Sequence, residues 1–323
     1  MAQPGAARVA PAAAITRAAS LQSYLTIRWL ADGDRRADAF ALYAYFRWLD
    51  DMIDERLPNR ERRLALVSRQ RDLLKGTTSS GISPEEALLS GLLRGSDDDG
   101  LRLSLGSMLD VMEFDARRRG RTVSQGELDE YTRVLAVAVT EALHHCIGHG
   151  CRSPHDETRY VAVTGAHVAH MLRDMVEDLA AGFVNVPADL LGVPPGGDAP
   201  MAGPHTADLL AAVLHAPEMR AWVRDRVGLA RSCFATGRRY LERVESPRCR
   251  LAGHAYIARF EWVLDAIERD GYRVRPGYPE RATLRGGLRI AADTVRSAAA
   301  ASRPGGRETA EPPAEQRTRE AVR

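Results

Sequence analysis

Residues 39–54 constrain the fold more than any other stretch of this sequence. The segment contains no Pro or Gly, and its apolar residues recur at helical spacing, so it predicts a helix that is buried on nearly all sides. One face of this helix carries polar side chains three or four residues apart: Tyr43, Arg47, Asp50, Asp51 and Asp54. Buried carboxylates repel one another unless a cation lies among them, so this face predicts a cation site.

A second stretch, residues 164–187, repeats this design far downstream. Asp174 and Asp178 are again four residues apart, and Gly182 with Pro187 predicts the end of the helix. The same face carries or adjoins His167, His170, Arg173 and Glu177. Two such helices facing one cavity would hold Mg²⁺ ions, which prefer oxygen ligands and are often shared with substrate phosphates. The predicted metal ligands are Asp50, Asp54, Asp174 and Asp178.

Both stretches resemble the aspartate-rich motifs of a known family. Tyr43-Ala-Tyr-Phe-Arg47-Trp-Leu-Asp50-Asp51-Met-Ile-Asp54 is similar to the first such motif of the squalene/phytoene synthase family, and Leu172-Arg173-Asp174-Met-Val-Glu177-Asp178 is similar to its second. Further matches at Asp115, at 127–131 and at 256–272 extend the resemblance in order over about residues 20–290. The resemblance implies an all-α isoprenoid synthase fold around a central cavity, Mg²⁺ dependence and a prenyl diphosphate substrate (farnesyl, geranylgeranyl or shorter).

Composition narrows the alternatives. The chain has 323 residues, of which 45% are hydrophobic, so it can bury a large core. A net charge of +2, with no basic run interleaved with aromatic residues, argues against nucleic-acid binding. Four irregularly spaced cysteines indicate a reducing, cytoplasmic setting. No apolar run approaches the roughly 20 residues of a transmembrane helix, although release of an apolar product would suit peripheral membrane contact.

The breaks at Gly- and Pro-rich points divide the chain into helices, and no convincing strand appears. We expect helices at about 20–32, 35–56, 59–75, 84–94, 101–118, 126–147, 156–181, 205–216, 218–244 and 248–270. These form one helical domain at 18–300. The Ala/Pro-rich start (1–17) and the Pro-, Gly- and Glu-rich end (301–323) predict disordered tails.

The resemblance also assigns substrate contacts, with some departures. It places Ser23, Tyr43, Arg47, Asp51, Tyr131, Arg173, Glu177 and Tyr256 around the prenyl diphosphate. However, Gln22 and Phe183 stand where the family has cations that hold diphosphate, and Asn185 replaces a tyrosine. Downstream arginines offer replacement cations: Arg275, Arg281, Arg285 and Arg289.

His167 and His170 replace an amide pair of the family on the metal-binding face. A neutral imidazole there could remove a proton from an acceptor, so we treat both as candidate catalytic residues together with the four aspartates. Nearer the middle of the chain, His144, His145, Cys146, His149 and Cys151 form a cluster that invites a zinc interpretation, but their spacing matches no standard zinc site.

Three enzymatic readings remain open. The first is head-to-head transfer of a prenyl group to a second prenyl diphosphate. The second is a divergent, phytoene-synthase-like prenyltransferase acting on a small aromatic acceptor, and the third is a terpene cyclase. A helical interaction protein that had lost its chemistry would be expected to have broken acid pairs, and both pairs are intact.

Overall fold

A computed structural model describes residues 6–78, 80–94, 96–197, 214, 216–278 and 294. The described residues form helices and no strand, with one isolated parallel β-bridge between Val123 and Pro187, so the all-α prediction is confirmed. The helices are α1 (Ala6–Ala19), α2 (Leu21–Leu30), α3 (Arg36–Asp51), the π-helical turn η1 (Met52–Arg56), α4 (Arg60–Lys75), α5 (Glu86–Arg94), α6 (Asp99–Arg118), α7 (Gln125–Cys146), α8 (Thr158–Ala180), α10 (Pro217–Glu242) and α11 (Pro247–Arg269).

The helix ends follow local sequence signals. Ser124 and Glu127 form a capping box at the start of α7, and Ser20 caps α2 through the backbone amide of Ser23. Gly76 ends α4 and Gly182 follows α8, both with positive φ. These signals explain why the ends predicted for α4 to α8, α10 and α11 lie within two residues of the observed ones. The helix predicted at 205–216 and the tail at 301–323 fall almost entirely outside the described residues.

The N-terminal segment differs from its prediction. We expected a disordered tail over 1–17, whereas residues from Ala6 onward form α1. The inner face of α1 buries Ala12 and Thr16, and Ala12 packs with Phe40 and Ala44 of α3. Small side chains allow this close approach, and the burial stabilises a helix whose Ala/Pro-rich sequence resembles low complexity.

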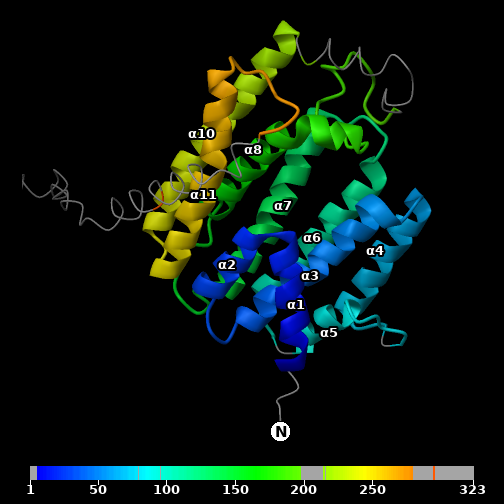
Figure 1. Ribbon diagram of the computed structural model, residues 1–323, viewed down its shortest axis with the longest axis vertical. Helices are drawn as coiled ribbons and strands as arrows, with labels where there is room; N and C mark the ends of the chain where they lie inside the picture. Colours follow the sequence, from blue (N-terminus) through cyan, green and yellow to red (C-terminus); the bar gives the residue numbers. More distant parts are fainter. Residues whose placement is uncertain are drawn as a thin grey trace, which may run out of the picture.

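Two hydrophobic cores lie on either side of α7 (Figure 1). The first core joins α3, α4, α5 and α6 around Tyr45, Leu49 and Leu105, and the hydroxyl of Tyr45 donates to Gln70 at 3.1 Å. The second joins α8, α10 and α11 around Met175, Phe234 and Val263, among others. Because α7 packs against α6 on one side and α8 on the other, polar side chains at the ends of α6 and α7 meet those of α3 and α8.

Close backbone approaches fix α8 against α10. A Cβ atom added at Gly165 would lie 2.7 Å from Cys233 Cβ, and one added at Gly237 would lie 2.7 Å from Ala162 Cβ. At the start of α8, the buried Arg159 guanidinium donates two hydrogen bonds to Glu141 of α7, at 2.7 and 2.9 Å. These contacts hold α8 closely against both α10 and α7. Within the described residues, no helix combines the length and apolar character that a membrane span requires.

Candidate active site

A cavity of about 390 Å³ lies where α3, η1, α6, α7 and α8 meet. Carboxylates dominate its lining, and basic, aromatic and imidazole groups complete it. The lining residues are Arg47, Asp50, Asp51, Asp54, Glu55, Asp115, Arg118, Tyr131, His167, His170, Met171, Glu177, Asp178, Phe183 and Asn185. Acidic side chains of both predicted stretches therefore face one space.

The end of α3 widens into a π-helical turn at the aspartate-rich motif. The backbone amide of Leu57 donates to the carbonyl of Met52, five residues earlier, at 2.9 Å. A π turn contains more residues than an α turn, so Asp54 and Glu55 both face the cavity with Asp50. The sequence predicted a regular helix through residue 56, and the π turn adds Glu55 to the predicted carboxylates. Arg119 donates to the backbone carbonyl of Asp54 at 2.5 Å and fixes this turn.

The cavity carboxylates are poorly compensated by positive charge. Burial, followed by the neighbouring carboxylates Asp50 and Asp115, raises the pKa of Asp54 to about 7. Burial raises the pKa of Asp50 to about 6 despite the nearby Arg47, and burial with Asp174 raises that of Asp178 to about 7. Positive charge placed among these groups would therefore be strongly favoured.

Asp174 is held differently from the other predicted metal ligands and is absent from the cavity lining. Arg173 donates two hydrogen bonds to its carboxylate, both at 2.5 Å, and His170 Nε2 lies 2.7 Å from it. Burial alone would raise the pKa of Asp174, but these partners lower it. Asp178, a predicted metal ligand, and Glu177, a predicted substrate contact, are thus the acidic residues of the second motif that line the cavity with Asp50 and Asp54.

Arg118 is a cavity residue that the sequence analysis missed. It is almost completely buried, and it donates to Asp115 at 2.6 Å and to the side chain of Asn185 at 2.7 Å. Its guanidinium carbon lies 4.8 Å from the centre of the Tyr131 ring and 5.1 Å from that of Phe183. A positive charge therefore lies beside Phe183, where the family resemblance indicated a missing cation. The i,i+3 spacing of Asp115 and Arg118 was the only available signal.

The segment after α8 positions Asn185, the hydrogen-bond partner of Arg118. Gly182 accepts a hydrogen bond from the amide of Gly120 at 2.8 Å, and Ala188 donates to Val123 at 2.8 Å. This pairing with the loop between α6 and α7 brings Asn185 into the cavity, where its amide also donates to Asp178 at 2.6 Å. Asn185 thus links Arg118 to Asp178.

The two predicted histidines have different surroundings. His167 is buried, with its ring centre 5.1 Å from that of Tyr131, and its Nε2 atom has no hydrogen-bond partner among the described residues. Burial, assisted by His170 and Arg118, holds the pKa of His167 well below its ordinary value, so the ring is neutral at pH 7. His170 is half-exposed and paired with Asp174. The Nε2 atom of His170 is thus engaged with Asp174, whereas the Nε2 atom of His167 has no such partner among the described residues.

Four predicted substrate contacts are not in the cavity lining. Ser23 lies in the first turn of α2, where its backbone amide donates to the side chain of Ser20. Tyr43 and Tyr256 are half-buried, and Tyr256 packs against Phe260 with ring centres 5.3 Å apart. Arg173 is committed to Asp174.

The predicted replacement cations do not reach the cavity in the described part of the chain. Arg275 donates to Asp270 at 2.8 Å beyond the end of α11, and it is not among the lining residues. Arg281, Arg285 and Arg289 lie outside the described residues.

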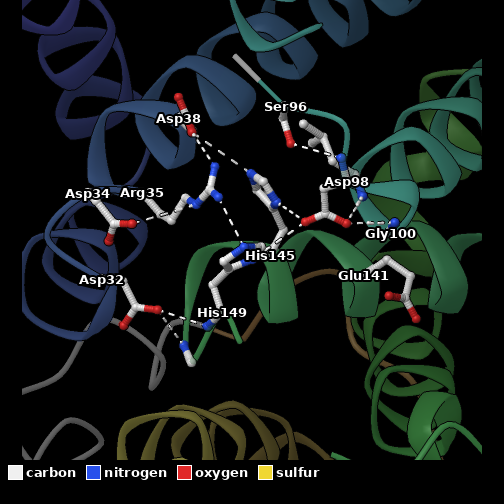
Figure 2. Close-up of polar contacts among 12 residues, drawn as sticks. Asp32, Asp34, Arg35, Asp38, Ser96, Asp98, Gly100, Glu141, His145 and His149 are labelled. Atoms are coloured by element: carbon white, nitrogen blue, oxygen red, sulfur yellow. Dashed lines mark hydrogen bonds and ion pairs between the residues drawn. The ribbon is translucent and has the colours of Figure 1, made fainter. Parts of the chain in front are cut away.

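The histidine and cysteine cluster divides into separate contacts (Figure 2). His145 Nδ1 lies 2.6 Å from Asp98 Oδ2, and His149 Nδ1 lies 3.5 Å from the same oxygen. Arg35 lies 3.0 Å from His149 Nε2. Because a guanidinium can only donate, His149 accepts at Nε2 and carries its proton at Nδ1, toward Asp98. One ligand atom from each of Asp98, His145 and His149 lies within 4.8 Å of the others, so these three residues are close enough together to hold a metal ion.

The remaining members of that cluster have structural partners or lie apart. His144 Nε2 lies 2.9 Å from the hydroxyl of Tyr240, and Cys146 is buried, which raises the pKa of its thiol to about 12. Cys151 is exposed.

Comparison with known proteins identifies the family. The sequence model of the squalene/phytoene synthase family matches residues 16–287, which is most of the chain. The chain belongs to this family. Its members are prenyltransferases that bind prenyl diphosphates and use divalent metal ions, so this chain is an enzyme of that class. The chain matches no curated protein sequence.

Solved structures of squalene/phytoene synthase relatives share the fold. Squalene synthase HpnC from Alicyclobacillus acidocaldarius superposes with a TM-score of 0.63 at 20% identity, covering 83% of this chain and 96% of that one. A dehydrosqualene synthase in complex with ligand gives 0.65 at 16% identity, covering 90% and 97%. A complex of TcSQS with the ligand BPH1237 gives 0.60 at 14% identity, covering 93% of each chain. The predicted isoprenoid synthase fold is therefore confirmed.

Proposed function

We propose that this squalene/phytoene synthase family member is an Mg²⁺-dependent prenyltransferase that ionises an allylic prenyl diphosphate and transfers the prenyl group to a second prenyl diphosphate. One observation carries the proposal. Asp50 and Asp54 face Asp178 across a single cavity, and burial, together with neighbouring carboxylates, raises the pKa of all three above the ordinary value. Such a site gains most from divalent cations that arrive with a polyanionic substrate.

The cavity donors fit Mg²⁺. All three carboxylates offer hard oxygen ligands, and the cavity has room for the water molecules that Mg²⁺ retains. Asp50, Asp54 and Asp178 would hold the metal, with Asp174 available if Arg173 turned away. Bound Mg²⁺ supplies Lewis acidity to phosphate oxygens, which makes diphosphate a better leaving group.

Arg118 and Arg47 would complete the diphosphate site. The Nε and Nη1 atoms of Arg118 are bonded to Asp115 and Asn185, while the described residues provide no hydrogen-bond acceptor for Nη2. The guanidinium is therefore held rigidly with one donor group left for a phosphate oxygen. Arg47 pairs with Asp51 at 2.5 Å at the more exposed side of the cavity, so it can exchange this partner for substrate.

The bond changes balance without any redox partner. The C1–O bond of the donor breaks and its electron pair leaves with diphosphate. The acceptor supplies an electron pair to C1, and the resulting cationic adduct loses a proton. Tyr131 and Phe183 line the cavity, where aromatic rings would stabilise positive charge and exclude water. The pKa of Tyr131 is raised far above its ordinary value by burial and by Asp115, so the phenol remains protonated.

His167 favours a second candidate function, transfer to a small aromatic acceptor. A neutral buried imidazole with a free ring nitrogen is suited to remove the proton that such an acceptor loses. If this is the reaction, His167→Gln should reduce coupled product far more than diphosphate release. His170→Asn is the matched control, because His170 is committed to Asp174 and should affect both steps together.

The test is incubation of the purified full chain with Mg²⁺ and prenyl diphosphates of different lengths, alone and with aromatic acceptors. Diphosphate release and product mass are measured in parallel. A head-to-head C30 or C40 product from prenyl diphosphate alone would support the first function and end the aromatic alternative. Product that appears only with an aromatic acceptor would support the second. Full turnover in EDTA would contradict the metal requirement that both candidate functions share.

A further inference from the structure

The outer face of α2 is an unusually apolar part of the surface. Leu21, Leu25 and Trp29 follow one another at four-residue spacing, so they form one stripe, and their exposed fractions are 57%, 44% and 68%. No residue of α2 is fully buried. Ile15, one turn before the bend at Ser20, is 43% exposed and continues the apolar surface onto α1.

Exposed large hydrophobic residues are concentrated in this part of the surface. Half of the large hydrophobic residues that are exposed in the described part of the chain fall between Ile15 and Trp29. The others lie apart from one another, in the connection between α4 and α5 or on α6, α10 and α11: Ile82, Leu103, Leu229 and Leu251. Scattered exposed hydrophobic residues are normal, whereas an apolar stripe on one helix marks an interaction surface.

The inner side of α2 explains why this face must point outward. The ring of Tyr24 packs against that of Phe40, with centres 5.6 Å apart, and Ile27 and Leu30 contact the core around α8, α10 and α11. These contacts fix the rotation of α2 about its axis. The stripe therefore cannot turn inward without breaking the packing of the opposite face.

The charge of this region is entirely basic. The first 31 residues contain Arg8, Arg17 and Arg28 and no acidic residue, and Asp32 is the first carboxylate in the chain. The guanidinium of Arg28 lies 5.1 Å from the centre of the Trp29 ring, so a cation and an amphipathic aromatic group are presented together on the exposed face. Trp at the level of lipid headgroups and Arg beside anionic phosphates are characteristic of helices that lie in a membrane interface.

We propose that α2, with the last turn of α1, docks this enzyme on the surface of an anionic lipid bilayer. Leu21, Leu25 and Trp29 enter the boundary between headgroups and acyl chains, and Arg17 and Arg28 contact lipid phosphates. The basic charge favours this occupant over a second copy of the same face, because two copies would bring like charges together. The surface is separate from the acid cavity, so this docking does not depend on which prenyl transfer the enzyme catalyses.

The test is cosedimentation of the full chain, without substrate, with vesicles of phosphatidylcholine that contain phosphatidylglycerol. Binding is expected to be stronger than to pure phosphatidylcholine and to weaken with added salt. The double variant Leu25→Gln, Trp29→Gln should lose roughly tenfold or more in partition, because it removes most of the inserting apolar area. Leu103→Gln with Leu229→Gln is the control, since it removes two exposed hydrophobic residues elsewhere (48% and 37% exposed), and it should bind like the wild type.

A second measurement covers the case of a misfolded variant. Vesicles with brominated acyl chains should quench the fluorescence of the wild type more than that of Trp29→Phe, while circular dichroism verifies the helical content of every protein. The proposal is overturned if the wild type does not bind anionic vesicles, or if the control variant loses as much binding as the α2 variant. It is also overturned if sedimentation velocity shows a dimer that only the α2 variant disrupts, since a second copy would then cover the face.

Discussion

Helices α3, α6 and α7 bring carboxylates together with imidazole and guanidinium groups at both of their ends. At one end, Asp50, Asp115 and Tyr131 contribute to the acid cavity. At the other, Asp38 of α3, Asp98 at the start of α6 and His145 of α7 form the cluster of Figure 2. Along α6, Asp98 and Asp115 are separated by roughly 25 Å at the helical rise per residue.

The two ends differ in charge compensation rather than in residue type. In the acid cavity the pKa values of Asp50, Asp54 and Asp178 are raised, because burial and mutual repulsion outweigh the nearby arginines. In the other cluster, hydrogen bonds from His145 and from the backbone of α6 lower the pKa of Asp98 despite its burial. The first site therefore needs an added cation, whereas the second is already neutralised. The presence of His and Asp alone does not distinguish a ligand site from a structural one.

The largest expected effect is on activity. Asp50→Asn or Asp178→Asn should reduce diphosphate release by about 10²–10³-fold, because each removes a charge that would hold Mg²⁺ against the leaving group. The measurement is the rate of diphosphate release at saturating Mg²⁺. Asp98→Asn is the control from the other cluster and should retain activity once corrected for the folded fraction. Equal losses in all three variants would remove the functional distinction between the two ends.

The next effect is on stability, in the balanced cluster. Asp98→Ala should cost about 2–4 kcal/mol, since it removes the N-cap of α6 and leaves the buried His145 without its main partner. Urea unfolding of the metal-free protein measures this difference. Asp99→Ala, at the neighbouring exposed position, is the matched control and should change stability by less than about 0.5 kcal/mol. A loss for Asp98→Ala no larger than the control would show that the cluster contributes little.

In the acid cavity, removing a carboxylate should stabilise the metal-free protein rather than destabilise it. The raised pKa of Asp178, about 7, means that its contribution to stability is lost as pH rises from the unfolded value near 4 through 7. Asp178→Asn should therefore stabilise the metal-free protein by about 1–3 kcal/mol at pH 7.5 and by nearly nothing at pH 4. Urea unfolding in EDTA at both pH values is the measurement. A variant less stable than the wild type at pH 7.5 would contradict the idea of uncompensated charge.

How far the sequence predicts these regions depends on the range of the interactions involved. Helix ends such as those of α4 and α7 were predictable because caps and breakers act within a few residues. The acid face of residues 50–54 followed from spacing alone. In contrast, α1 was missed because its stability comes from packing Ala12 against Phe40 rather than from its own sequence signals.

The missed parts of the site depend on contacts between distant segments. Arg118 meets Asn185, 67 residues later, only because the segment after α8 pairs with the loop before α7. The commitment of Asp174 to Arg173 is local, but spacing did not show whether that guanidinium would turn toward its neighbour or toward the cavity. Residue types at helical spacing thus predicted which groups are present, while long-range packing decides which of them carry free charge.

The smallest expected effect concerns the pH dependence of the balanced cluster. His145 faces Asp98 and Asp38, with Arg35 and His149 beside them (Figure 2). Burial opposes protonation of His145, but the carboxylates of Asp38 and Asp98 raise its pKa above the ordinary value. Its contribution to stability is therefore fully present below about pH 6.5 and is lost as pH rises through the raised pKa. Asp98, with a lowered pKa, contributes above about pH 4 and loses its contribution as pH falls through that lowered value.

The stability difference between the wild type and Asp98→Asn should thus be greatest between about pH 4 and 6.5 and should shrink by about 1 kcal/mol toward pH 9. The amide retains an oxygen that can cap α6, so the pH-dependent part of this difference isolates the charge pair. Urea unfolding of both proteins across this range, in EDTA, provides the measurement, and His149→Gln tests whether the second imidazole carries any of the dependence. A difference that stays constant from pH 5 to 9 would mean that His145 is neutral throughout, and that hydrogen bonding without ionic charge holds this end of α3, α6 and α7 together.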